Sequence, residues 1–138
     1  MQKIILSFLL VIPSIANAEV DPSIGIAYER YSVIAGAWFV NQKCKFLSEE
    51  QATEFTRDVK AINVSLSLAL EHPAMQLSIQ KSAKAVADSE KYASCPAVAN
   101  EIVTYGVRAS RAWSAMIRQA TIAGAVRLSS PLSSDTTK

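Results

Sequence analysis

Apolar residues recur at spacings of three and four along most of this chain, which is the period of an amphipathic helix. The strand pattern of alternating apolar and polar residues is almost absent, and the 138 residues include only 4 glycines and 5 prolines. The sequence therefore predicts an all-α fold. We expect four helices, at about residues 23–44, 48–72, 73–90 and 97–128.

The helix expected from residue 48 has the clearest boundaries. Ser48 and Gln51 fit a capping box, in which each side chain bonds to the backbone amide of the other residue. His72-Pro73 ends this helix, because the residue before a proline disfavours the helical conformation. The last helix either continues through Gly106 or breaks there.

Helical spacing also predicts which faces lie in the core. The first helix is apolar over most of its circumference, so we expect neighbours on several of its sides. The inward positions of the second helix are Ala52, Phe55, Val59, Ile62, Leu66 and Ala69. Those of the third are Met75, Ile79, Ala83 and Val86. Those of the fourth are Val98, Ile102, Tyr105, Ala109, Trp113, Met116, Ala120 and Ala123.

The first 18 residues have the layout of a secretory signal peptide. Lys3 supplies a positive charge, a nine-residue apolar run follows, and Ala16-Asn17-Ala18 matches the small–x–small cleavage signature. The apolar run is shorter than the roughly 20 residues that span a bilayer. We therefore expect cleavage between Ala18 and Glu19, with export to the periplasm or out of the cell.

The expected compartment determines how the two cysteines are interpreted. In an oxidising environment an even number of cysteines favours a disulfide, and two cysteines allow only the pairing of Cys44 with Cys95. If four helices run up, down, up and down, both cysteines lie at the same end. We therefore predict an up-down four-helix bundle cross-linked by one disulfide; the alternative is two free, buried thiols.

The helical domain is expected to cover residues 19–128. A chain of this length can bury a core without a metal ion. Residues 129–138 are polar, rich in serine and threonine, and contain Pro131, so they are expected to form a disordered tail. Glu29 and Arg30 interrupt the apolar first helix, which argues against a stable membrane span.

No motif in the sequence points to an enzyme. His72 is the single histidine, and a hydrolase would need it beside a nucleophile. Glu50, Glu54 and Asp58 lie on one helix face at spacings of four, and we expect that face to be solvated. The alternative is a pair of carboxylates that act as general acid and base.

Metal and cofactor sites are not expected either. Zinc sites need clustered cysteine and histidine ligands, and both cysteines are assigned to the disulfide. A haem ligated by His72 with Met75 or Met116 is the alternative, but a Cys-x-x-Cys-His attachment motif is absent. We therefore predict no cofactor and no metal.

Arginines mark one face of the last predicted helix, at Arg108, Arg111 and Arg118. Residues 46–72 carry five acids against two bases, whereas residues from 96 onward carry five bases against two acids. Two interpretations follow: the basic helix packs against the acidic one, or the arginines form a docking stripe for an anionic partner. Since the net charge is only +2, nucleic acid is not an expected partner.

A continuous last helix would be about 45 Å long and would extend past its shorter neighbours. Ile117, Ile122 and Val126 would then overhang, and unpartnered apolar helix surface marks a contact site. We expect a non-catalytic, exported binding or accessory protein whose partner is another envelope protein or a second copy of itself. The candidate partner-binding residues are Arg108, Arg111, Arg118, Ile122 and Val126.

Two other functions stay open at this point. The first is a periplasmic stress chaperone that exposes apolar helix faces at low pH, when its carboxylates lose their charge and its basic residues repel one another. The second is an enzyme with an unrecognised site.

Overall fold

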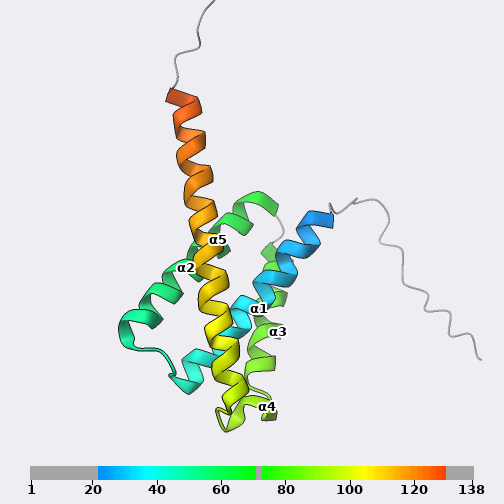
Figure 1. The fold of residues 1–138 in the computed structure, drawn as a ribbon. Coiled ribbons are helices and arrows are strands. Elements are labelled where there is room, and N and C mark those ends of the chain that lie inside the picture. Colours follow the sequence, from blue (N-terminus) through cyan, green and yellow to red (C-terminus); the bar gives the residue numbers. More distant parts are fainter. Residues whose placement is uncertain (1–21, 71–72, 130–138) are drawn as a thin grey trace, which may run out of the picture.

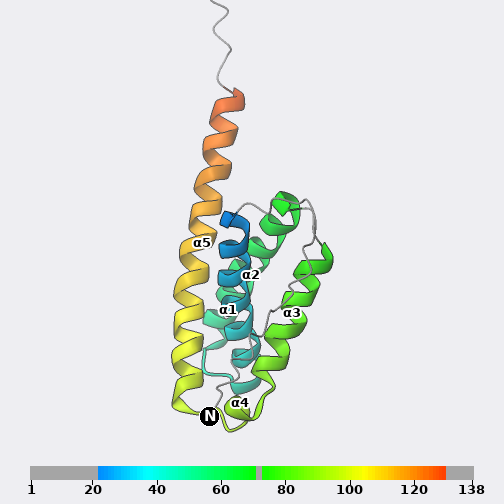
Figure 2. The ribbon, with the colours of Figure 1, turned by 90° about the vertical axis from the view of Figure 1, so that its right-hand side faces the viewer.

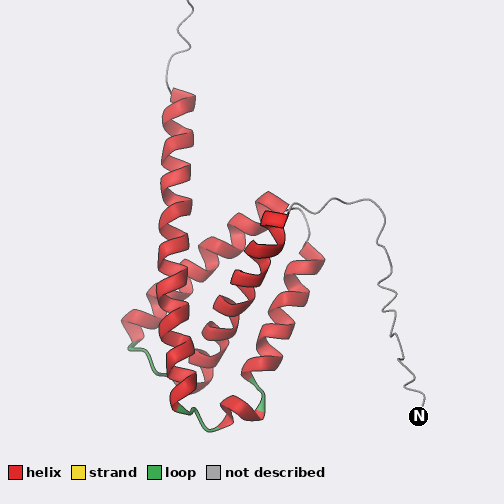
Figure 3. Cartoon of the chain, turned by 45° about the vertical axis from the view of Figure 1, so that its right-hand side comes forward, coloured by secondary structure: helices red, strands yellow, loops and turns green. Residues whose placement is uncertain are grey.

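The computed structural model describes residues 22–70 and 73–129, and in these ranges it contains helices and loops but no strand (Figures 1 and 3). The helices are α1 (Pro22–Cys44), α2 (Glu49–Leu70), α3 (Pro73–Ala87), α4 (Glu90–Ala93) and α5 (Ala97–Ser129). The prediction of an all-α fold is confirmed. The sequence did not predict α4, which is a single turn.

Several predictions fall outside the described residues. These are the signal peptide, its cleavage site between Ala18 and Glu19, the single histidine His72, and the polar tail from residue 130 onward.

Helix α1 lies at the centre of a helical bundle. It contacts α2, α3 and α5, and α5 also contacts α2. Figure 3 shows α1 between α5 and α3, and Figure 2 shows that consecutive long helices run in opposite directions. Tyr31, Ile34, Ala37 and Val40 are accordingly buried on different sides of α1. This position explains why α1 is apolar over most of its circumference.

Local sequence signals define the ends of α1 and α2. Ser48 N donates to Gln51 Oε1 at 3.1 Å, and Gln51 N donates to Ser48 Oγ at 3.2 Å, so the capping box is confirmed. Helix α1 ends where Lys45 adopts a left-handed conformation with φ of 55°. Lys45 N then donates to Asn41 O at 2.9 Å, which satisfies one of the last carbonyl groups of the helix.

The predicted disulfide between Cys44 and Cys95 is confirmed. Its two Cα atoms are 5.6 Å apart, and it joins the end of α1 to the loop between α4 and α5. A small core cluster lies close to this end of the bundle. Its buried members are Val40, Ala87, Tyr92, Ala99 and Val103.

The inward faces predicted for α3 and α5 need correction. Met75 and Val86 of α3 are 45% and 57% exposed, while Gln76, Ala83 and Ala87 are buried. On α5 the predicted core residues Tyr105 and Met116 are 52% and 60% exposed. The residues of α5 that are buried instead are mostly small: Ala99, Val103, Gly106, Ser110 and Ser114.

Helix α5 is continuous through Gly106, which settles the choice left open by the sequence. A Cβ atom at this position would overlap Ala37 Cβ and would lie 3.2 Å from Phe55 Cζ. Glycine therefore permits the close approach of α5 to α1 and α2. Ile117 packs against the core and does not overhang, so that part of the expectation is wrong.

Candidate functional site

Two of the three predicted arginines of α5 contact acids of α2. Arg111 Nη2 lies 3.4 Å from Glu54 Oε2, and Arg118 Nη1 lies 3.8 Å from Asp58 Oδ1. Arg118 Nη1 also donates a hydrogen bond to Ser114 Oγ at 2.7 Å. Packing of the basic helix against the acidic one therefore accounts for these two arginines.

The expectation of a solvated acidic face is wrong for Asp58. Asp58 is only 3% exposed, and its Oδ1 atom makes no hydrogen bond within the described ranges. The guanidinium groups of Arg57 and Arg118 face this oxygen, with Arg57 Nε 3.7 Å away. Asp58 is buried because α5 packs over this side of α2, whereas Glu50 stays exposed.

The remaining candidate residues of α5 lie apart from these ion pairs. Arg108 is exposed and forms no ion pair with the part of the chain that the structure describes. Ile122 is 64% exposed, beyond the last residues of α5 that pack on the core. The backbone of Val126 belongs to α5, but its side chain lies outside the described residues. The five candidates therefore do not converge on one enclosed site.

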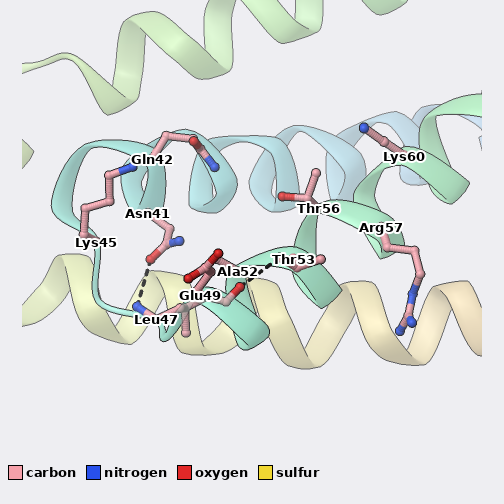
Figure 4. A pocket seen from close by; sticks show the side chains of 10 residues that line it. All are labelled: Asn41, Gln42, Lys45, Leu47, Glu49, Ala52, Thr53, Thr56, Arg57 and Lys60. Atoms are coloured by element: carbon pink, nitrogen blue, oxygen red, sulfur yellow. Dashed lines mark hydrogen bonds between the residues drawn. The ribbon is translucent and has the colours of Figure 1, made fainter.

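A large hollow lies at the corner where α1 turns into α2, and Figure 4 shows it from close by. Its volume is about 680 Å³, and Lys45, Arg57 and Lys60 contribute three cations against the single acid Glu49. Asn41 and Leu47 also line it, and Asn41 Oδ1 accepts a hydrogen bond from Leu47 N at 3.2 Å. The remaining lining residues are Gln42, Ala52, Thr53 and Thr56.

A partly buried polar network connects α1, α2 and α3, and Asn63 Oδ1 is its centre. That oxygen accepts hydrogen bonds from Tyr31 Oη at 2.7 Å, from Gln80 Nε2 at 2.9 Å and from Gln76 Nε2. Gln76 Nε2 also donates to Asn63 O at 2.8 Å, and Ser67 Oγ donates to Gln76 Oε1 at 2.9 Å. The network satisfies its buried polar groups, so we assign it to fold specificity.

Sequence reasoning missed this network, although a signal was present. Gln76, Gln80, Ala83 and Ala87 follow one another at spacings of four, three and four, which places them on one face of α3. Of these four residues only Ala83 is among the predicted inward positions, because the spacing of apolar residues does not mark a glutamine as inward-facing.

An apolar groove of about 320 Å³ lies between α1 and α3. Gly36 and Ala83 line it, and the exposed Val33 and Val86 also border it. Ser32 and Ser82 are its only hydroxyl groups besides that of Tyr92. The groove lacks the charged or amide side chains that usually orient a small ligand.

Metal and membrane chemistry find no support within residues 22–70 and 73–129. These residues contain no group of three or more histidine, cysteine, aspartate or glutamate side chains that could hold a metal ion. None of the helices within these ranges is both long and apolar enough to cross a bilayer.

Comparisons of the chain with protein families, with curated proteins and with solved structures found no match.

Proposed function

We propose that this protein is a non-catalytic, exported binding or accessory protein that acts through the outer face of α5. One observation carries the proposal: α5 extends past the ends of the other helices (Figures 1 and 2), and large apolar side chains along it are exposed. Tyr105, Met116 and Ile122 are 52%, 60% and 64% exposed. Apolar surface that is exposed along one element marks a candidate contact site.

The extended end of α5 has no intramolecular role within the described ranges. All residues from 119 to 123 are exposed, and the last residue that packs against the core is Ile117. Two or three helical turns therefore lie outside the bundle. An isolated helix end of this kind is only marginally stable in water, so a partner that covers it would stabilise it.

Two features support an exported location. Residues 1–18 match a secretory signal peptide, and the disulfide between Cys44 and Cys95 is of a kind that persists in oxidising compartments. Mass spectrometry of protein recovered from the periplasm or medium tests both features. The expected species begins at Glu19 and takes up no alkylating reagent before reduction.

Site-specific photo-crosslinking tests the binding surface. A photoreactive amino acid at Ile122 should give discrete adducts in cells that export the chain. The same amino acid at Leu77 of α3, which is also an exposed apolar position at 52%, should give none. Equal adducts from both positions, or none from Ile122, would contradict the proposal.

A stress chaperone is the second candidate, and the charged contact between α2 and α5 favours it, because Arg57 and Arg118 both face Asp58 there. At low pH the carboxylates of the chain would lose their charge, and its basic residues would repel one another. The two helices would then separate more easily and expose Phe55 and Ile62, which are buried in the structure. Acid-dependent binding of a hydrophobic dye and suppression of aggregation are the expected results; a closed, inert protein at pH 3 would exclude this candidate.

A further inference from the structure

Helix α5 carries a second apolar stripe that its own bundle covers only in part, at Ile102 and Ala109. We define this stripe, the seam, by residues at alternating spacings of four and three: Val98, Ile102, Tyr105, Ala109, Ala112, Met116, Gln119 and Ala123. Val126 continues the same spacing in the sequence. Such a repeat of seven residues is the pattern by which one helix packs along another in a coiled coil.

The seam lies beside the face of α5 that is most deeply buried in the bundle. The packed face runs through Ala99, Val103, Gly106, Ser110 and Ser114, which are all buried. Along the seam, by contrast, Val98, Tyr105 and Met116 are 37%, 52% and 60% exposed. Ala112, Gln119 and Ala123 are exposed as well. Ile102 and Ala109 are half-buried against the core, so intramolecular packing explains the spacing at these two positions and leaves the other six exposed.

The middle of the seam is also hollowed. A groove of about 290 Å³ runs between α1 and α5, and four seam residues line it. They are Tyr105, Ala109, Ala112 and Met116. Two small alanines between two large side chains leave space into which side chains of a second helix can insert, as coiled-coil packing requires.

From this geometry we propose that the seam binds the seam of a second copy of the chain, in parallel orientation and with twofold symmetry. This inference rests on the proposed function, because it names the partner of the same face of α5. The choice of a second copy follows from Gln119, the single polar residue of the seam. In a parallel pair Gln119 lies opposite itself, and two amide side chains can hydrogen-bond to each other.

An antiparallel pair that overlaps along the whole seam fits less well. Gln119 would then lie opposite Ile102, which leaves its amide without a polar partner in the contact. Charges do not oppose the parallel pair, because the flanking residues Glu101 and Arg108 lie opposite Gly106 and Trp113 of the other copy. Arg108 has no ion pair with the described residues of its own chain, so it is free to stack on Trp113.

The size of the seam predicts a reversible dimer. From Val98 to Ala123 α5 is about 38 Å long, and a helix is about 10 Å wide, so each copy contributes about 400 Å². The total of about 800 Å² is below the roughly 1,200 Å² of a standard stable interface. We therefore expect association that depends on protein concentration, with the copies separating on dilution.

Light scattering after size-exclusion chromatography tests the association with two matched variants of the full exported protein. Ala112→Glu places like charges opposite each other on the seam, whereas Ala85→Glu adds the same charge at an exposed position of α3. The wild type and Ala85→Glu should shift from monomer to dimer as concentration rises to about 1 mM, while Ala112→Glu stays monomeric. Unchanged circular dichroism of Ala112→Glu would show that its fold is intact.

Cysteine cross-linking tests the parallel orientation. Gln119→Cys should give a covalent dimer under mild oxidation, because the two residues face each other. Thr121→Cys, two residues along the exposed end of α5, should not. A wild type that stays monomeric at about 1 mM, or equal dimerisation of Ala112→Glu and Ala85→Glu, would overturn the proposal. So would failure of Gln119→Cys to cross-link in a dimeric protein.

The outcome also separates this inference from the proposed function. A strict monomer whose Ile122 position still cross-links to another protein would overturn self-association and leave the binding role of α5 in place. Loss of both results would overturn both.

Discussion

Two buried tyrosines of α1 differ in whether their hydroxyl groups have a partner. Tyr31 Oη donates to Asn63 Oδ1 and accepts a hydrogen bond from Gln80 Nε2, whereas Tyr28 Oη makes no hydrogen bond within the described ranges. We predict that Tyr28→Phe raises the free energy of unfolding by about 1 kcal/mol and that Tyr31→Phe lowers it by about as much. Urea denaturation of both variants measures this difference. A loss of stability in Tyr28→Phe would contradict the prediction.

The same residue gives the protein a predicted response to alkaline pH. Burial raises the pKa of Tyr28 above its usual value of 10.0, because the charged phenolate is poorly solvated in the core. The preference of the folded state for the neutral form is fully present below pH 10.0 and is lost as pH rises through the higher folded pKa. Stability should therefore fall above about pH 10, and Tyr28→Phe should show a smaller fall. Identical alkaline unfolding of both proteins would exclude Tyr28 as the cause.

Substitution of two glycines inside helices should change the free energy of unfolding in opposite directions. A Cβ at Gly106 would overlap Ala37, whereas a Cβ at Gly36 would meet nothing within 4 Å. Gly106→Ala should lower the free energy of unfolding by about 1–3 kcal/mol, because α5 must move outward. Gly36→Ala should raise it by about 1 kcal/mol, because alanine favours the helix more than glycine does. Denaturation midpoints compare the two, and equal effects would show that Gly106 is not a point of close approach.

At the scale of the helices, local sequence signals predicted the boundaries well. The capping box of Ser48 and Gln51 and the sequence His72-Pro73 each act within one turn, so a window of a few residues is enough to recognise them. The faces of α3 and α5 were harder to predict. The two stripes of α5 that begin at Val98 and Ala99 are offset by one residue, and both have helical spacing. Which stripe faces α1 depends on tertiary packing, where the small Gly106 allows the closer approach.

The sequence predicted that α2 and α5 contact each other, but not which of their side chains are buried. The opposite charges of the two segments correctly suggested that they pack together, as the pairs of Arg111 with Glu54 and of Arg118 with Asp58 confirm. The burial of Asp58 was not predictable, because an aspartate at this spacing looks the same whether water or an arginine of another helix faces it. The sequence therefore predicted which two helices contact each other, but not which side chains are buried in that contact.

That contact gives a prediction for two matched arginines. Arg118→Gln should lower the free energy of unfolding by about 1 kcal/mol, because it leaves buried Asp58 with fewer compensating charges. Arg111→Gln should cost less than about 0.5 kcal/mol, because its partner Glu54 is partly exposed. In an Asp58→Asn background the cost of Arg118→Gln should shrink, which a double-mutant cycle measures. An undiminished cost in that background would show that Arg118 acts through Ser114 instead.

For the whole molecule, the disulfide is the feature that sequence and structure agree on most fully. Two cysteines, an expected oxidising compartment and a predicted alternating helix order were enough to pair Cys44 with Cys95. The central position of α1, in contact with α2, α3 and α5, could not be derived in the same way. Several packings of four helices leave both cysteines at one end, and the choice among them depends on side-chain fit such as that between Gly106, Ala37 and Phe55.

Removal of the disulfide should weaken the molecule unevenly. The bond closes a loop of 51 residues, so its loss should lower the free energy of unfolding by about 4 kcal/mol on the chain-entropy model. The loss should be concentrated at the end of the bundle where Val40, Tyr92 and Val103 form the smaller core cluster. That cluster joins α1, α4 and the start of α5, and α4 is too short to be stable by itself.

Hydrogen exchange of a Cys44→Ser/Cys95→Ser variant, read by mass spectrometry, measures this pattern. Amides of α4 and of the first turns of α5 should exchange much faster than in the wild type, while those of α2 around Ile62 should change least, because Ile62 belongs to the larger core cluster. A uniform acceleration over all helices would mean that the bundle opens as one unit. In that case the disulfide stabilises the whole fold and not one end of it.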